Sequence, residues 1–475
     1  MSTVQLSEYE RKRLDNIREN EALLRNLEIP QMNLKKSAPT ASNLKKHIPK
    51  PKRKERQLPT RASNRLRGKN PDEEELKRGL AAVEADGLIT KRQKLETLDV
   101  LNEKEHRELK NLMQDALAMP NTQPTVKQEP GLVIESDTAL ETRLANMKIE
   151  HEWATVKVTT SRITAAQFHP SDTKLLACAV DTEGYLGFWD VQGVQEDGDP
   201  VVYQYRPHTS NVTDLHFIPS DHSKIMTSSY DGRIRTFDMN KTEFAEDLDL
   251  EGEKYGITCF DISQDGHQVW FSTSDGQAVL KDKRANRLTE HQLREKKIGC
   301  IHLNPVHQHL MAAASNDRTM TIWDTRMLKD QTPLESVEHG YSVTSSYWSP
   351  QGNIIATASY DDYIRLFDLG DNQKSLALKS AIRHNNHTGR WVTNFRARWN
   401  TNKFNGLDYQ HLIIGNMKHT TDIYSGVTGK EVARLYDSDH ITAIPSVCQF
   451  HPTTANPTIL TANAGGRVVC WTSPS

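Results

Sequence analysis

From residue 151 onward, short apolar segments alternate with polar turn signals, and one apolar pattern recurs along the chain. Each copy is a run of strand-forming residues that ends in a large apolar residue, usually just before a proline. The clear copies read ITAAQFHP, VTDLHFIP, IGCIHLNP, VTSSYWSP and SVCQFHP, and weaker copies begin at Ile257 (ITCFDIS) and Phe395 (FRARWN). The pattern therefore predicts seven repeated units, each with its own apolar strand.

A tight turn and a closing strand follow each of these segments. In SSYDGRIRTFD, ASNDRTMTIWD and ASYDDYIRLFD, the turn residues Asp231, Asp317 and Asp361 each precede the closing aromatic by six residues. Weaker closing strands end at Trp189-Asp190, Lys281-Asp282, Tyr424 and Trp471. The spacing is at or a little above the roughly 40–45 residues of WD repeats. A four-stranded blade cannot bury both faces alone, so the sequence predicts an all-β fold, a seven-bladed WD-repeat β-propeller over residues 151–475.

The ends of this region predict how the ring closes. Only TSPS follows Trp471, so the last unit lacks its outermost strand. The segment EWATVKV, residues 152–158, alternates apolar and polar positions and precedes the first unit. We expect it to supply the missing edge strand, which would leave no open sheet margin; the alternative is a loose strand before the propeller.

Residues 1–150 have a different composition. Tyr9 is the only aromatic residue before Trp153, so this region is predicted to be largely disordered. Three segments have helical character, LSEYERKRLDNIRENEALLRNLEI, PDEEELKRGLAAVEADGL and EHRELKNLMQDALAM, and helices this short need to dock on a partner or on the folded domain. From residue 35 to 69, thirteen Lys or Arg accompany one acid, Glu55. Such a basic segment suggests a nuclear import signal or a nucleic-acid-binding arm, with a charged linker as the alternative.

Composition limits the remaining classes of function. The formal net charge is −2, no apolar run approaches the roughly 20 residues of a membrane span, and the N-terminus is too polar for a secretory signal. Five scattered cysteines predict reduced core residues and a reducing compartment, the cytosol or the nucleus. His307 and His309 are either exposed loop residues or a metal pair, and exposure is the commoner case. No GxxxxGK, GxSxG or HExxH motif occurs, so we predict no catalytic site, no cofactor and no metal.

The segment NHTGRWVTNFRARW, residues 386–399, combines arginines and large aromatics without an acid. The repeat register makes Ala397 and Trp399 core residues, and the alternating arginines at 396 and 398 point the other way. Arg390 and Trp391 fall on the loop that leads into the sixth blade. Either Trp391 packs beneath a neighbouring blade, or it projects and stacks on an exposed base while the arginine holds phosphate.

Three segments together carry a family resemblance: IGCIHLNPVHQHLMAAASNDRTMTIWDTRML, HTGRWVTNFRARW and GKEVARLYDSDHITAIPSVCQFHP. They resemble the WD-repeat DNA damage-binding proteins, which comprise the fungal changed-mutation-rate protein, its animal counterpart and the small subunit of the UV-damaged-DNA-binding complex. In that subunit a hairpin at this rim enters the minor groove beside a flipped-out lesion. The resemblance implies DNA contacts at the matching positions, although the wedge residues differ in type, so lesion specificity is not implied. The DNA-binding candidates are His387, Gly389, Arg390, Trp391, Arg162, Lys296 and Lys297.

Arg162, Lys296, Lys297 and Arg390 all precede the innermost strand of a blade. One rim of a propeller gathers all such loops, so these cations are expected to lie on one surface and to bind DNA there. The alternative is ordinary rim charge.

The segment Trp323-Asp324-Thr325-Arg326 has the WDxR form seen in substrate receptors of cullin-four ubiquitin ligases. The resemblance implies an adaptor contact at Trp323, Asp324 and Arg326. We therefore expect a nuclear DNA-binding protein of the DNA damage response, with DNA, chromatin proteins and this adaptor as partners and no membrane. The alternative is a protein-interaction scaffold or ligase receptor on chromatin that uses the rim for peptides.

Overall fold

The computed structural model describes residues 101–118, 137–151, 153–171, 173–250, 256–406 and 410–473, all within one compact unit, Ala81–Ser475. The basic segment 35–69 and the two helices predicted before residue 90 lie outside the described residues. None of the helices in the described ranges is long and apolar enough to cross a membrane.

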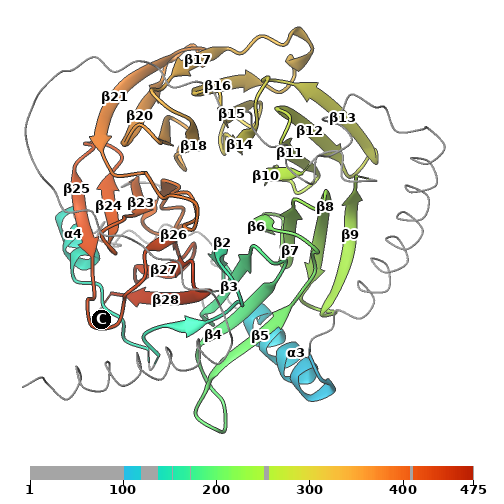
Figure 1. Ribbon diagram of the computed structural model, residues 1–475, viewed down its shortest axis with the longest axis vertical. Helices are drawn as coiled ribbons and strands as arrows, with labels where there is room; N and C mark the ends of the chain where they lie inside the picture. The colour runs from blue at the N-terminus through green and yellow to red at the C-terminus, as the bar shows by residue number, and fades with distance from the viewer. Residues whose placement is uncertain are drawn as a thin grey trace, which may run out of the picture. The chain divides into compact units, whose positions relative to one another are not determined.

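Seven four-stranded antiparallel sheets form a ring around a central channel (Figure 1). In six of them, the strands follow chain order from the channel outward, so each sheet is a simple meander. Blades 1 to 3 contain β2 (Ile163–Phe168), β3 (Leu176–Asp181), β4 (Leu186–Val194), β5 (Pro200–Tyr205), β6 (Val212–Ile218), β7 (Asp221–Ser229), β8 (Arg233–Asp238), β9 (Glu243–Asp249), β10 (Ile257–Ile262), β11 (Gln268–Thr273), β12 (Gln277–Asp282) and β13 (Arg287–Gln292).

Blades 4 to 6 repeat this arrangement, with a 3-10 turn, η2 (Leu328–Asp330), after β16. Their strands are β14 (Ile298–Leu303), β15 (Leu310–Ser315), β16 (Thr319–Asp324), β17 (Glu335–Glu338), β18 (Val343–Trp348), β19 (Ile354–Ser359), β20 (Tyr363–Leu369), β21 (Leu376–Arg383), β22 (Arg398–Trp399), β23 (His411–Gly415), β24 (Thr421–Ser425) and β25 (Glu431–Leu435). The innermost strand of blade 6 has only two residues, although the sequence pattern FRARWN suggested a longer one.

Blade 7 is completed by residues from before the first blade. Its strands are β26 (Pro445–Phe450), β27 (Thr458–Asn463), β28 (Arg467–Thr472) and, at its outer edge, β1 (Val156–Lys157). Val156 pairs with Val468 and Lys157 with Arg467, and a further bridge joins Lys148 to Thr472. The predicted clasp is therefore confirmed, and it joins the two ends of the propeller in one sheet.

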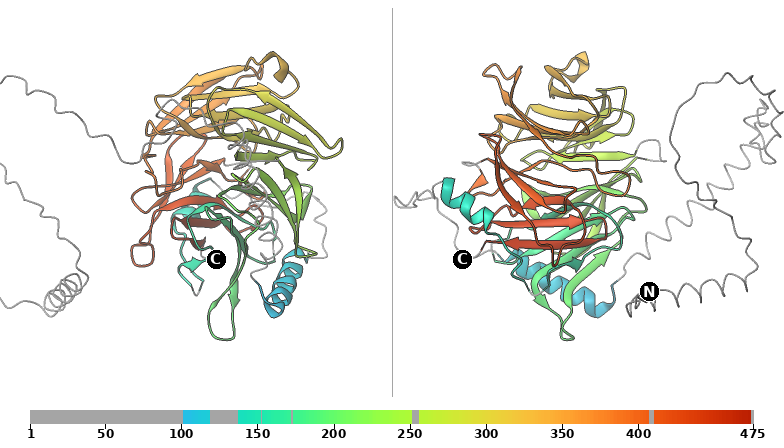
Figure 2. Two further views of the ribbon diagram at one scale, coloured as in Figure 1. Left: turned by 45° about the vertical axis from the view of Figure 1, so that its right-hand side comes forward. Right: turned by 60° about the vertical axis from the view of Figure 1, so that its left-hand side comes forward.

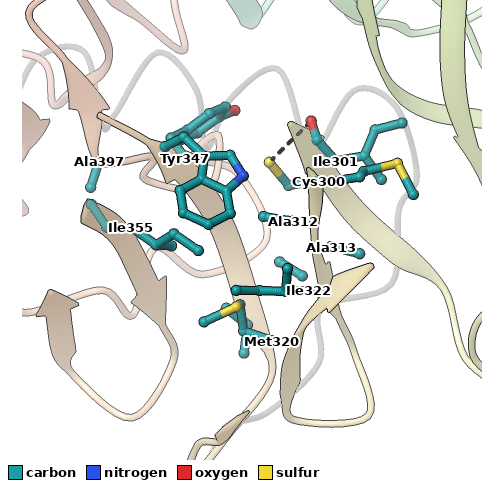
Figure 3. Packing of buried hydrophobic residues seen from close by; sticks show 14 of the residues in the cluster. Cys300, Ile301, Ala312, Ala313, Met320, Ile322, Tyr347, Ile355 and Ala397 are labelled. Atoms are coloured by element: carbon teal, nitrogen blue, oxygen red, sulfur yellow. Dashed lines mark hydrogen bonds between the residues drawn. The ribbon is translucent and has the colours of Figure 1, made fainter. Parts of the chain in front are cut away.

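The core lies between neighbouring blades. The second strand of a blade is buried over its whole length in β3, β15, β19 and β27, because it is covered on both faces. Figure 3 shows Ala312 of β15 on the same side of the sheet as Met320 and Ile322 of β16, whereas the neighbouring Ala313 points to the other side. The predicted core residues Ala397 and Trp399 are buried as well. The all-β, seven-bladed prediction is confirmed.

Two helices that precede the propeller pack against its outer surface, α3 (Glu103–Leu117) beside β5 and α4 (Asp137–Ala145) beside β25 (Figures 1 and 2). Asn102 caps α3: its Oδ1 accepts hydrogen bonds from the amides of Lys104 (3.0 Å) and Glu105 (2.9 Å). The apolar face of α3, which includes Leu109 and Met113, is fully buried. The third predicted helix therefore exists and docks on the folded domain.

All five cysteines are free and buried, as the sequence analysis predicted. Burial raises the pKa of Cys448 and of Cys470 to about 12, because a thiolate is poorly solvated inside the protein. These thiols are apolar packing residues.

Candidate nucleic-acid interface

The two rims of the ring differ in the loops they carry. Because each blade is an antiparallel meander, the first strand of every blade begins on one rim, which we name the leading rim, and the other rim is the trailing rim. The leading rim carries the loops before β2, β14 and β22 and the turns between second and third strands. Arg162, Lys296, Lys297 and Arg390 all lie in such loops, so they share this rim.

The loop between β21 and β22, residues 384–397, is held from two sides. On its own side of the ring, Asn386 donates from Nδ2 to the carbonyl of Ser359 (2.9 Å), and its amide donates to Asp362 Oδ1 (3.0 Å). From blade 1, Arg162 Nη1 donates to the carbonyl of Arg390 (2.8 Å). The loop is therefore fixed between blade 5 and blade 1.

At the tip of this loop, Trp391 is 74% exposed, the largest value among the exposed large apolar side chains of the described residues. Arg390 lies over the indole, with Cζ 5.1 Å from the ring centroid. Gly389 has φ +64°, a left-handed conformation that favours glycine and turns the chain sharply at this point. The indole therefore projects from the surface, and it is not packed beneath a neighbouring blade.

The other predicted DNA-binding residues differ in their exposure. Lys296 is exposed, whereas Lys297 is half-buried: its Nζ donates to the Tyr230 hydroxyl and lies 4.9 Å from that ring's centroid. Arg162 is half-buried against the β21–β22 loop. His387 is exposed, with Nδ1 3.5 Å from Asp362 Oδ1. The structure thus brings all seven residues to one rim, where all except Arg162 and Lys297 are exposed.

Further cation–aromatic pairs on this rim were missed by the sequence analysis. Besides Arg390 with Trp391 and Lys297 with Tyr230, the leading rim carries Arg206 over Tyr185, Arg318 over Tyr341 and Arg365 over Tyr363, at 5.3, 5.9 and 5.0 Å. Such pairs present flat, cationic surfaces on which bases can stack. A signal existed for one of these aromatic residues: Tyr363 follows the turn residue Asp361 by two positions, so the repeat register already placed it on this rim.

Acids are also present on the leading rim, so its charge is not uniform. Glu183, Asp275 and Glu295 are exposed there. The turn residue Asp231 is occupied by hydrogen bonds from the amides of Thr209 (3.1 Å) and Arg233 (3.0 Å). Among the described residues of this rim, the basic groups gather towards the channel, where Arg162, Lys297, Arg390 and Arg396 line one cavity.

Arg396 and Arg398 do point away from the core, and they enter the central channel. Both contact Asp214 of blade 2, at 3.0 Å from Arg396 Nη1 and 3.5 Å from Arg398 Nη2. Arg398 also lies 4.1 Å from the centroid of Tyr347. Burial alone would raise the pKa of Asp214, but His216 and the two arginines outweigh it and hold that pKa well below its usual range. Asp214 is therefore a carboxylate that two guanidinium groups share.

The WDxR residues lie at the trailing rim, at the end of β16. Trp323 is buried, and its indole N–H donates to Thr321 Oγ1 (2.9 Å). Asp324 accepts two bonds from Arg326, from Nε at 2.9 Å and from Nη2 at 2.6 Å. Only the arginine reaches the surface, with its side chain 66% exposed. Arg326 and the leading-rim cations therefore face opposite sides of the ring.

The structure shows no set of ligands for a metal in its described ranges, where no three His, Cys, Asp or Glu side chains are grouped to hold an ion. His307 and His309 lie close together, with ring centroids 6.3 Å apart.

Comparison with known proteins shows which sequences this chain resembles. The sequence model of the WD domain, G-beta repeat matches residues 200–238, 283–324 and 331–368. The chain is 33% identical to the DNA damage-binding protein CMR1 of Phaeosphaeria nodorum, over 98% of this chain and 99% of that protein. It is 31% identical to the DNA damage-binding protein cmr1 of Emericella nidulans and 32% identical to that of Neurospora crassa, again over at least 98% of each chain.

Proposed function

The chain belongs to the CMR1 family of WD-repeat DNA damage-binding proteins, and on this premise we propose that it binds DNA through the leading rim of its propeller, with a preference for UV-damaged or distorted duplex. It acts as a binding protein in the DNA damage response and DNA metabolism, and it works in the nucleus. Neither a catalytic group nor a cofactor is part of this proposal.

The observation that carries the proposal is the exposed indole of Trp391 beside Arg390 on a loop fixed from two blades. A large apolar side chain at the surface costs solvation unless it has a partner, and a fixed loop loses little entropy when a partner binds. Damage and distortion weaken base stacking, so an indole inserts there more easily than into intact duplex. One stacked base contributes about 1–3 kcal/mol.

The cations around Trp391 supply the sequence-independent part of the affinity. Lys296 and Arg390 are exposed, and each neutralised phosphate releases counterions, which makes binding depend on salt. The basic segment 35–69 is proposed to add a second, non-specific contact and to direct the protein to the nucleus.

The proposal is tested with fluorescence anisotropy on UV-irradiated duplex, intact duplex and single-stranded DNA. Trp391→Ala is expected to weaken binding to irradiated duplex by about 5- to 150-fold, the equivalent of one lost stack, and to weaken intact duplex less. Trp391→Phe should recover part of the loss because it keeps a ring. Phe404→Ala is the matched control: Phe404 is also an exposed aromatic beside a lysine, Lys403, but it lies on the trailing rim. Equal losses on irradiated and intact duplex would rule out the wedge.

The salt dependence gives a separate test of the surface. Lys296→Gln and Arg390→Gln should each lower the slope of log affinity against log salt by about 1, on every probe. A slope near zero for the unmodified protein would instead favour the protein-interaction scaffold that uses this rim for peptides.

A second function is proposed for the trailing rim, where Arg326 would contact the adaptor of a cullin-four ubiquitin ligase and connect the chain to chromatin proteins. Its support is the exposure of Arg326 and of the adjacent Met327, on the face opposite the proposed DNA surface. Arg326→Ala should abolish co-purification of the adaptor and leave DNA binding unchanged. If the adaptor still co-purified with the Arg326→Ala variant, this second proposal would be wrong.

A further inference from the structure

The leading-rim mouth of the central channel contains a cavity of about 430 Å³. Four cationic side chains line it, those of Arg162, Lys297, Arg390 and Arg396, and among the described residues no Asp or Glu belongs to its lining. The rest of the lining is mostly hydroxyl and amide groups. The acids of this rim that the structure describes lie outside the cavity, so the described lining has an unbalanced positive charge that favours an anion.

The floor of the cavity holds the guanidinium of Arg396, whose side chain is 18% exposed, in a fixed position. Arg396 Nη1 donates to Asp214 Oδ2 (3.0 Å) and to the Tyr347 hydroxyl (3.4 Å). Because Asp214 also neutralises Arg398, the three side chains together retain one positive charge. The hydrogen bonds of Arg396 to described residues all use Nη1, so Nε and Nη2 remain for another acceptor.

The walls of the cavity are rigid because threonines tie neighbouring blades together. Thr164 donates to the carbonyl of Val212 (2.5 Å), Thr258 to Ile298 (2.5 Å) and Thr344 to Phe395 (3.1 Å). Each bond joins the first strand of one blade to the next blade, around the mouth. The cavity is therefore held open by the fold itself, and it needs no bound partner to keep its shape.

Blade 4 breaks the threonine repeat and thereby enlarges the cavity. Blades 1, 2, 3 and 5 have a threonine after the first residue of the inner strand, whereas blade 4 has Gly299, directly after Ile298. A Cβ added to Gly299 would meet no atom within 4 Å. Because Gly299 has no side chain, the channel mouth has free space beside the cationic Lys297.

We propose that this cavity binds a phosphomonoester, the terminal phosphate of a nucleotide or of a nucleic-acid strand end. A volume of about 430 Å³ is in the range of small-molecule sites, roughly 300–1,000 Å³, and a whole duplex is too wide to enter it. A terminal phosphate carries about −1.5 to −2 charges at pH 7 and has three strong acceptor oxygens, which suits several convergent cations better than a backbone phosphate diester does. The cavity shares Arg162, Lys297 and Arg390 with the proposed DNA surface, but its occupation does not require duplex binding.

Calorimetric titration of the full chain tests the proposal with two pairs of probes. One pair is thymidine 5′-monophosphate and thymidine; the other is an eight-nucleotide oligothymidine with and without a 5′-phosphate. Phosphorylation is expected to strengthen binding at least tenfold in one pair or in both, and the responding pair identifies the source of the phosphate. Equal affinity within both pairs would overturn the proposal.

Gly299→Leu is the decisive variant, because it places a bulky side chain in the cavity, which Gly299 and Lys297 both line, without removing a charge or a hydrogen bond. It should abolish the preference for the phosphorylated probe and leave the affinity for intact duplex unchanged. Lys297→Gln provides a second variant that keeps the cavity open and should reduce the preference at least fivefold. A preference that survives in both variants would overturn the proposal, because the phosphate would then bind elsewhere.

Two controls separate this inference from the proposed DNA function. Trp391→Ala should lose affinity for irradiated duplex but keep the phosphate preference, since the indole is not among the cavity-lining residues. Arg284→Gln removes an exposed arginine of the trailing rim and should change neither measurement. Loss of the phosphate preference in Trp391→Ala would contradict a separate cavity site.

Discussion

At the residue scale, two aspartates make contacts of different range. Asp231 accepts bonds from Thr209 and Arg233, within its own blade and the loop before it, whereas Asp214 accepts a bond from Arg396 of blade 6. The position of the turn aspartates follows from their spacing alone. Trp391 and Arg390 could be assigned to a loop in the same way. The partner of Arg396 could not, because Asp214 lies 182 residues earlier and no local spacing connects the two.

The shared carboxylate leads to a prediction about stability. Asp214→Ala would leave the mostly buried Arg396 and Arg398 without the counter-charge of a fully buried carboxylate, and breaking a buried pair in this way costs about 3–5 kcal/mol of unfolding free energy. Urea denaturation measures the loss. The control is Asp249→Ala, which removes one of the two carboxylate partners of Arg233 at the partly exposed outer edge of blade 2 and should cost about 1 kcal/mol or less. Similar losses in the two variants would show that the channel cluster contributes little.

At the element scale, the sequence predicted the secondary-structure type of each segment more accurately than its position in the fold. The edge strand in residues 152–158 was predicted both in type and in position, because the last blade lacked a strand and β1 was the available segment. The helix α3 was predicted in type only. Its docking site depends on Tyr203 and Tyr205 of β5 and on Thr242, which meet its residues Glu108 and His106 only after the ring has closed.

The docking of α3 gives the second prediction. Leu109 is fully buried between the helix and blades 1 and 2, so Leu109→Ala should remove about 2–5 kcal/mol of local packing energy. A helix of this length is marginal alone, so the amides of residues 103–117 should exchange their hydrogens much faster. Hydrogen-exchange mass spectrometry measures this exchange rate, and Lys110→Ala, at an exposed position of the same helix, is the control. Unchanged exchange in Leu109→Ala would mean that the contact with the propeller does not hold the helix.

At the scale of the whole molecule, closure of the ring brings residues that are far apart in the sequence onto one surface. Loops that precede the inner strands of blades 1, 4 and 6 all reach the leading rim. Arg162 and Arg390 are more than 200 residues apart in the sequence, yet Arg162 Nη1 lies 2.8 Å from the carbonyl oxygen of Arg390. The sequence predicted this convergence from the order of strands in a blade. The sequence did not predict the cavity at the mouth, because loops and inner strands of several blades, among them Gly299 and Arg396, line it together only after the ring has closed.

The whole fold should also lose stability in mild acid, because burial keeps several of its histidines neutral. Burial lowers the pKa of His169, His302 and His339 from 6.5 to about 4, since the charged ring is poorly solvated there. Between pH 6.5 and 4 the unfolded chain therefore binds more protons than the folded one, and the stability present above pH 6.5 is lost as the pH falls. Each histidine contributes at most about 1.4 kcal/mol per pH unit.

His302 offers the most direct test of this acid sensitivity. Its Nδ1 accepts a hydrogen bond from the amide of Trp348 (3.1 Å), which a protonated ring cannot do. We expect the urea midpoint of the unmodified protein to fall steadily from pH 7.5 to 5. The glutamine in His302→Gln can still accept the hydrogen bond from Trp348 through its amide oxygen, but it cannot take up a proton. A plot of its urea midpoint against pH should therefore run parallel to that of the unmodified protein above pH 7 and fall less steeply below pH 6.5. Parallel curves over the whole range would show that another group causes the acid sensitivity, because the ring between blades 4 and 5 would then titrate alike in the folded and unfolded chain.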